Sequence, residues 1–198
     1  ATANGNIRRS DMADFANINA GGKIAIRLDE SDSLIGVQFC NDESQILLAS
    51  KFGKSIRFAL DKLRVIKSRT SAGVRGMKLV EGNKVISLTI LNELNITREQ
   101  KELYLSIALD DRKTISSLEE FDATSIPEIE DLPKELIYEM AQKEEYILTI
   151  TENGYGKRTS SYEYRSTNRG GSGIINIVTS ERNGNVVASF TAFDDDEV

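Results

Sequence analysis

The chain has 198 residues, 39% of them hydrophobic, so it can bury a core, and it contains no histidine. This excludes Ser-His and Cys-His nucleophile pairs, histidine general bases and histidine metal sites, and no pair of acids stands out as catalytic. One cysteine excludes an internal disulfide framework and fits a reducing compartment, and we expect this residue, Cys40, to pack in a core strand. No apolar run approaches the roughly 18 residues of a membrane span, and no signal peptide is visible.

One short block occurs three times along the chain. It reads ATANGNIRRS at 1–10, LLASKFGKSIRF at 47–58 and ILTITENGYGKRTS at 147–160. Each copy has a strand-like run, a tight turn ending in glycine, and a second strand with arginine four positions after that glycine. The recurring arginines are Arg9, Arg57 and Arg158.

A second block follows each copy of the first. It reads AGGKIAIRL at 20–28, SAGVRGMKL at 71–79 and GGSGIINIV at 170–178, and each copy leads to another apolar run, at 34–39, 85–90 and 186–190. The short β-branched runs broken by turn signals predict antiparallel sheet throughout the repeats. The glycines of the second block predict a bend or a close approach of two backbones.

The spacing of the repeats requires one insertion. With about 50 residues removed between the second and third copies, the repeating unit has about 50 residues, the size of a four-stranded propeller blade. We therefore predict an all-β fold of propeller-like blades. Its parts are repeat one at 1–46, repeat two at 47–91, a helical acidic insertion at 92–145 and repeat three at 146–198.

The insertion is predicted to hold two helices. Thr97 begins one with Gln100 in capping-box spacing, and Pro133 begins the other. The simpler interpretation of the insertion is a helical pair packed on the repeats. The more specific interpretation is an element that binds a partner or mimics DNA.

The net charge of −6 is distributed unevenly along the chain. Residues 92–146 hold 15 acidic and 6 basic residues, whereas the repeats, without the acidic run at 194–197, carry +7. A basic body of this kind is compatible with binding a polyanion. We interpret the run at 194–197 as a connecting loop rather than a metal site. Tyr155 and Tyr162 are interpreted as packing residues, since no base or metal cluster accompanies them.

The recurrence of the basic residues makes nucleic acid the leading hypothesis. If equivalent positions fall along one rim, that rim contacts phosphates rather than bases, so binding is independent of sequence and falls steeply with salt. The alternative is that these residues occupy the solvent face of half-exposed strands. The candidate DNA-binding residues are Arg8, Arg9, Lys23, Arg27, Lys54, Arg57, Lys67, Arg69, Arg75, Lys78, Lys157, Arg158, Arg165 and Arg169.

These blocks resemble the C-terminal domain of the DNA gyrase A protein. The resemblance is carried by ATANGNIRRS, GKIAIRLDESDSLIGV, SKFGKSIRF, TSAGVRGMKL, ENGYGKRTSSYEY and TSERNGNVV, which span all three repeats. The helical acidic insertion and RSTNRGGSG at 165–173 resemble alphaproteobacterial members. The heptapeptide known as the gyrase A box belongs to a first blade that this chain lacks; NRGGSG at 168–173 is a degenerate relative and is not assigned that role.

The resemblance implies a β-pinwheel, in which neighbouring blades exchange strands and duplex DNA wraps around a basic rim. It also implies partners in an A2B2 assembly, namely the rest of the gyrase A protein and the gyrase B protein, and a cytoplasmic, nucleoid-associated location. Mg²⁺ and ATP would act elsewhere in that topoisomerase, so we expect no cofactor, no metal and no turnover in this chain. Two rivals stay open: the equivalent domain of topoisomerase IV, and a propeller that serves as a protein-interaction platform.

Overall fold

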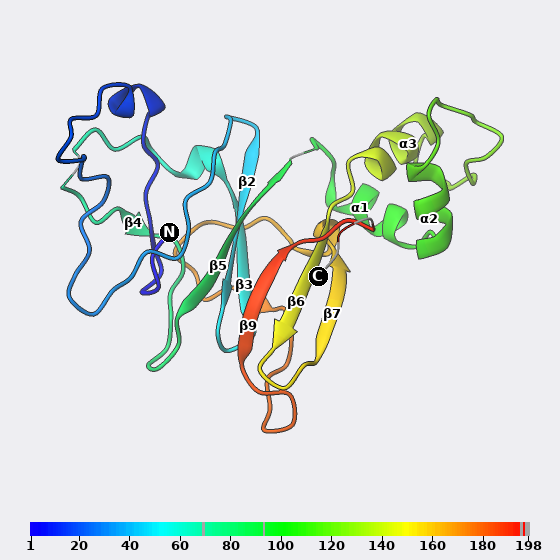
Figure 1. Ribbon diagram of the computed structural model, residues 1–198. Helices are drawn as coiled ribbons and strands as arrows, with labels where there is room; N and C mark the ends of the chain where they lie inside the picture. The colour runs from blue at the N-terminus through cyan, green and yellow to red at the C-terminus, as the bar shows by residue number, and fades with distance from the viewer. Residues whose placement is uncertain (69, 93, 195, 197–198) are drawn as a thin grey trace.

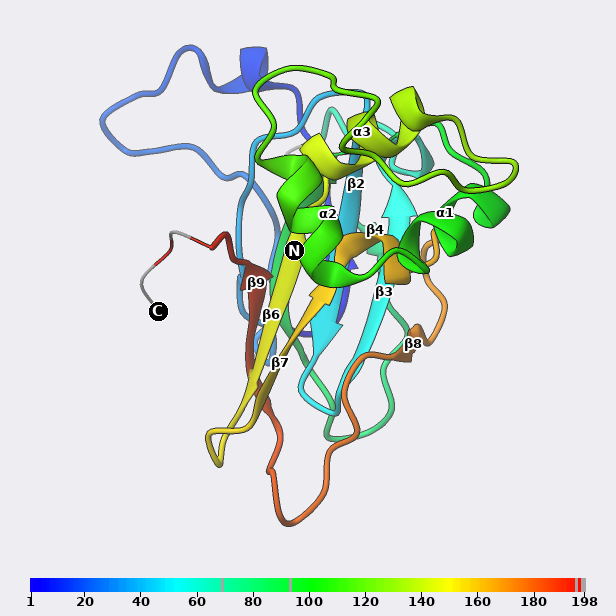
Figure 2. The same ribbon diagram turned by 90° about the vertical axis from the view of Figure 1, so that its right-hand side faces the viewer.

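The computed structural model describes residues 1–68, 70–92, 94–194 and 196. The described chain is mostly β, with three helices gathered at one end of the strands (Figures 1 and 2). No helix in the described residues is long and apolar enough to cross a membrane.

Repeat two forms the most complete sheet. The strands of this repeat are β2 (Ser44–Ser50), which begins three residues before the predicted start at 47, β3 (Lys54–Ala59), β4 (Val74–Arg75) and β5 (Val85–Asn92). β4 lies outside the main sheet. The sheet order is β5-β2-β3-β8, where β8 is Ile174–Ile175. Every residue of β2 is buried, because the strand is central in the sheet and its two faces pack in different apolar clusters, Ile46 and Leu48 in one and Leu47 in the other. The four-stranded antiparallel blade predicted from the repeat length is therefore confirmed here.

The fourth strand of that sheet comes from repeat three. This repeat contains β6 (Tyr146–Thr151), β7 (Gly156–Ser160), β8 (Ile174–Ile175) and β9 (Val186–Thr191). β8 pairs with β3, while β7, β6 and β9 form a separate three-stranded sheet. In the same way, β4 of repeat two pairs with β1 (Asn6–Ile7) of repeat one. Neighbouring repeats thus exchange one strand, as the resemblance implied.

Glycines allow the backbones of neighbouring repeats to meet. The carbonyl of Gly53 accepts hydrogen bonds from the amides of Asn176 (2.8 Å) and Ile177 (3.1 Å). One repeat earlier, the carbonyl of Gly5 accepts from the amides of Gly76 (2.8 Å) and Met77 (3.1 Å). A Cβ on Gly53 would lie 2.1 Å from the Ile177 carbonyl oxygen. The close backbone approach predicted for the glycines of the second block is confirmed in two of its three copies: a Cβ on Gly73 would lie 2.5 Å from the Ile7 carbonyl oxygen, and one on Gly173 2.3 Å from that of Ser55. In the first copy, Gly21 and Gly22 have no such neighbour within 4 Å.

Repeat one departs from the prediction of antiparallel sheet throughout. Residues 23–28 and 34–39 form no strand; they contribute only an isolated bridge between Thr2 and Leu34. Residues 23–24 correspond to β4 and β8, each of which pairs with a strand of the preceding repeat, and the described residues contain no such strand before β1. The apolar run at 34–39 likewise pairs with no strand. Cys40, which directly follows this run and was expected in the core, is exposed.

In the part of the chain that the structure describes, three short 3-10 helices connect the strands. They are η1 (Met12–Phe15), η2 (Leu60–Lys62) and η3 (Ser161–Glu163). η2 and η3 occupy equivalent places, directly after β3 and β7.

The insertion holds three helices rather than the predicted two: α1 (Arg98–Leu105), α2 (Leu109–Ser116) and α3 (Lys134–Gln142). The capping box of Thr97 and Gln100 is present. The additional helix begins after a break at Ser106–Ala108 and packs on α3. The insertion has its own apolar core, which also takes in Tyr162 from η3 of repeat three.

Candidate nucleic-acid interface

Among the recurring arginines, Arg57 is buried. It is only 3% exposed, and its guanidinium donates to Gln45 Oε1 (3.0 Å) and to the carbonyls of Ser161 (2.7 Å) and Tyr164 (3.4 Å). The prediction that Arg57 is a DNA-binding residue is therefore wrong for the described structure. A guanidinium enclosed by repeat three has no face left for a phosphate.

Arg9 makes the equivalent contact one repeat earlier. Its Nη1 donates to the carbonyl of Leu63 (3.5 Å), the residue that corresponds to Tyr164, and its Nη2 pairs with Asp42 (2.5 Å). The neighbouring Arg8 donates to the carbonyls of Ile66 (2.9 Å) and Ser68 (2.5 Å). For Arg9 and Arg57 the recurrence therefore has a structural cause: the arginine of one repeat binds carbonyls of the next.

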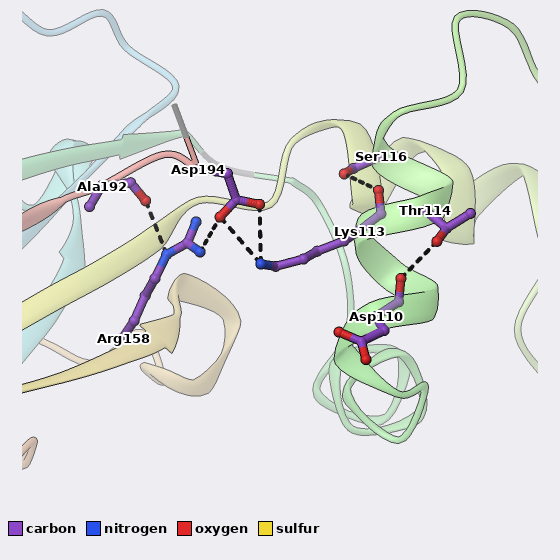
Figure 3. Close-up of polar contacts among 7 residues, drawn as sticks. All are labelled: Asp110, Lys113, Thr114, Ser116, Arg158, Ala192 and Asp194. Atoms are coloured by element: carbon purple, nitrogen blue, oxygen red, sulfur yellow. Dashed lines mark hydrogen bonds and ion pairs between the residues drawn. The ribbon is translucent and has the colours of Figure 1, made fainter. Parts of the chain in front are cut away.

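Arg158, the third of the set, is partly exposed and meets the insertion. Its guanidinium lies 4.2 Å from the centre of the Tyr146 ring, and its Nε donates to the Ala192 carbonyl (3.3 Å). It also pairs with Asp194, whose other oxygen lies 3.1 Å from Nζ of Lys113 in α2 (Figure 3). Hydrogen bonds from Lys113 and Arg158 lower the pKa of Asp194, so its carboxylate is ionised at neutral pH.

A group of basic residues gathers where repeats two and three meet. Nε of Arg169 donates to the Lys62 carbonyl (3.0 Å) and its Nη1 to the Arg75 carbonyl (3.0 Å). Further along the same segment, the amide of Lys78 donates to the Gly171 carbonyl (2.8 Å). We call Lys62, Arg75, Lys78 and Arg169 the junction cluster.

The junction cluster is open to solvent. All four of its residues are exposed. In the described part of the chain, the side chains of Arg75 and Lys78 make no hydrogen bond or ion pair, and Lys62 has only the adjacent Asp61 at 3.5 Å. The backbone segments that carry these residues are held together, and cationic side chains on two adjoining segments can contact neighbouring phosphates.

The remaining candidate residues are dispersed. Nζ of Lys23 is held by the carbonyls of Asp14 (2.5 Å) and Asn17 (2.9 Å). The others that the structure describes are exposed and, within the described residues, their side chains make no hydrogen bond or ion pair: Arg27, Lys54, Lys67, Lys157 and Arg165. Arg69 lies outside the described residues.

Of the two tyrosines interpreted as packing residues, one is buried and the other is exposed. Tyr162 is buried, and its hydroxyl donates to the Met140 carbonyl (3.0 Å), which confirms a packing role. Tyr155 is exposed and lies under the guanidinium of Arg182, 5.1 Å from ring centre to Cζ. No group of three metal-ligating side chains occurs among the residues that the structure describes.

Sequence reasoning missed two basic residues of interest, Lys62 and Lys113. Lys62 could have been found, because it lies between two repeat blocks as Lys67 does. Lys113 belongs to an acidic segment, and nothing in the sequence places it beside Arg158.

Comparison with known proteins identifies the family. The family model described as "DNA gyrase C-terminal domain, beta-propeller" matches residues 1–41, 44–92 and 145–192. The DNA gyrase A protein of Rickettsia bellii is 54% identical over 198 residues, covering 100% of this chain and 22% of that protein. That of Granulibacter bethesdensis is 44% identical, covering 96% of this chain and 21% of that protein. The chain thus spans about a fifth of the length of these relatives.

A solved structure shows the same fold. The crystal structure of the C-terminal domain of DNA topoisomerase IV matches with a TM-score of 0.67 at 15% identity, covering 98% of this chain and 45% of that chain. At this identity the likeness concerns the fold alone. The family is shown by the model that matches all three repeats and by the identity to the gyrase A proteins: this chain belongs to the DNA gyrase C-terminal domain family, the β-propeller, or β-pinwheel, domain of the gyrase A protein.

Proposed function

We propose that the chain binds duplex DNA without sequence preference and contributes to wrapping DNA around the C-terminal domain of the gyrase A protein. The observation that carries this proposal is the junction cluster, whose exposed cations lie on backbone segments that are held together where two repeats meet. Such side chains neutralise phosphates and release counterions, which supplies affinity without reading bases. Wrapping costs bending energy, and contacts repeated from blade to blade would offset it.

The wider role that we propose belongs to the whole enzyme. The relatives are full gyrase A proteins, and this chain would act in the cytoplasm with the rest of such a protein and with the gyrase B protein to support ATP-dependent negative supercoiling. Mg²⁺ and ATP would be used elsewhere in that assembly. The greater identity to gyrase A proteins favours gyrase over topoisomerase IV.

The test is a salt titration of binding to a random-sequence duplex of roughly 40 base pairs. We expect affinity to fall steeply between about 50 and 200 mM salt. The double variant Arg75→Gln and Lys78→Gln should lower the slope of log affinity against log salt by about 2, since two phosphate contacts are lost.

The matched control is a pair of lysines in the insertion. The double variant Lys134→Gln and Lys143→Gln removes the same charge, but among the described residues Lys134 and Lys143 bond other parts of the insertion, the Ala123 carbonyl and Glu139. Equal effects of the two double variants would refute a specific role of the junction cluster. Absence of DNA binding even at low salt would contradict the proposed function and leave the protein-interaction platform as the alternative to test.

A further inference from the structure

The contact between the insertion and repeat three brings two cations to one anion. Arg158 on β7 and Lys113 on α2 both bond the carboxylate of Asp194, which follows β9 (Figure 3). The two cations come from segments that lie 45 positions apart in the sequence. A guanidinium and an ammonium that converge on one oxyanion are also the groups that bind a phosphate.

The position of Lys113 is fixed by its helix. The preceding residue, Arg112, forms a buried ion pair with Glu144, and its Nε donates to the Ile107 carbonyl (3.2 Å). Ser116 Oγ donates to the carbonyl of Lys113 (2.8 Å), which ties down the last turn of α2. Since α2 is anchored from within the insertion, the backbone of Lys113 would keep its place beside repeat three if Asp194 moved away, and its ammonium would be free to bind another anion.

Of the three residues Arg158, Lys113 and Asp194, Asp194 is the one that a phosphate could replace. Its side chain is 54% exposed, against 28% for Arg158 and 35% for Lys113. Exposed ion pairs are weak, so exchange of one oxyanion for another costs little. The equivalent pair of repeat one, Arg9 and Asp42, has no second cation among the described residues, so repeat three differs by the lysine that the insertion supplies.

Nearby charge moderates the expected effect. Asp110 and Asp111 lie in the first turn of α2, and although Nζ of Lys113 bonds neither of them in the described structure, they oppose an incoming anion. We therefore expect one phosphate contact here rather than a broad anion site.

We propose that Arg158 and Lys113 form a phosphate-binding position for the backbone of duplex DNA, and that Asp194 occupies this position when DNA is absent. The inference rests on the proposed function and extends it, because it assigns a direct DNA contact to the acidic insertion. DNA binding would then require the exchange of Asp194 for a phosphate.

The experiment measures binding of the full chain to the same random-sequence duplex, across salt, for two pairs of variants. The first pair is Lys113→Gln and its control Lys143→Gln, which removes one charge from the insertion at a lysine paired with Glu139 of α3. The second pair is Asp194→Asn and its control Glu163→Gln, an exposed acid with no ion pair in the described residues. Thermal unfolding of each variant verifies that it is folded.

We expect Lys113→Gln to lower the salt slope by about 1, and Lys143→Gln to leave it unchanged. Asp194→Asn should tighten binding about 2- to 5-fold beyond Glu163→Gln, because the phosphate no longer competes with a carboxylate. The inference is overturned if Lys113→Gln matches Lys143→Gln, or if Asp194→Asn tightens binding no more than Glu163→Gln.

These outcomes are distinct from a failure of the proposed function. If the unmodified chain shows no salt-dependent binding to the duplex, both proposals fall together. If the unmodified chain binds and only the paired variants behave alike, the phosphate position alone is refuted. Should Lys113→Gln fold poorly, Lys113→Arg is measured in its place. It retains the positive charge, so the slope of log affinity against log salt is expected to equal that of the unmodified chain.

Discussion

At the scale of single residues, two turn glycines in equivalent places allow a matched comparison. Gly53 and Gly154 both have positive φ, 77° and 79°. A Cβ on Gly53 would overlap the carbonyl oxygen of Ile177, whereas a Cβ on Gly154 would meet nothing within 4 Å. The conformational cost of alanine is therefore shared, and the steric cost is not.

We predict that Gly154→Ala lowers the free energy of unfolding by about 1–2 kcal/mol, the cost of a left-handed alanine. Gly53→Ala should cost about 2 kcal/mol more, because two hydrogen bonds to the Gly53 carbonyl are disturbed at about 1 kcal/mol each. Urea denaturation of both variants measures the difference. Equal losses would show that the inter-repeat contact at Gly53 does not contribute to stability.

The burial of Arg57 leads to a second prediction. Arg57→Ala removes one partner of several buried hydrogen bonds and leaves the Gln45 side chain and the Ser161 carbonyl without this donor. We expect a loss of about 2–4 kcal/mol in the free energy of unfolding, measured by urea denaturation. Lys54→Ala, an exposed change in the same strand, is the control and should change stability by less than about 0.5 kcal/mol. A small effect of Arg57→Ala would contradict the role of this residue between repeats.

At the scale of elements, the insertion carries a pH-dependent weakness. Burial raises the pKa of Tyr104 and of Tyr162 above the ordinary value of 10.0. A folded-state pKa above the unfolded one gives stability that is complete below about pH 10 and is lost as the pH rises further. We predict that the helices unfold in alkali, as followed by far-ultraviolet circular dichroism.

Tyr162→Phe checks the cause of that unfolding. It removes one of the two buried phenols together with its bond to the Met140 carbonyl. We expect the alkaline midpoint to move to higher pH, at a cost near neutral pH of about 1 kcal/mol for the lost hydrogen bond. An unchanged midpoint would mean that tyrosine ionisation does not limit the stability of the insertion.

The elements also show what the sequence could predict. Local signals identified the capping box at Thr97 and the glycine turns, because these features depend on neighbouring residues alone. Strand formation at 23–28 was predicted wrongly, because a strand needs a partner that local sequence does not reveal. The same limit explains the wrong prediction for Arg57. Recurrence in the sequence cannot distinguish an arginine that bonds carbonyls of the next repeat from an arginine exposed on the rim.

At the scale of the whole molecule, the acidic insertion lies beside basic repeats. Its ends are close together, since the Asn92 amide donates to Glu145 Oε2 (2.8 Å), so a short glycine-serine linker can replace residues 93–144. Repeats two and three stay joined through β3 and β8 and through the core of Leu47, Leu91 and Ile147. We therefore expect the shortened chain to fold.

Removal of the insertion should speed DNA association only at low salt. Its negative charge repels the duplex over roughly 30 Å at 0.01 M salt, but over only about 8 Å at 0.15 M. We predict that stopped-flow association is several-fold faster for the shortened chain at about 0.01 M salt and equal to that of the intact chain near 0.15 M. As a control, the intact chain is given glutamine at the exposed positions Glu119, Glu120, Glu128 and Glu130, which reduces the charge and keeps Lys113. This variant should also associate faster at low salt. If the shortened chain and the glutamine variant both associate more slowly than the intact chain at low salt, repulsion by the insertion is contradicted.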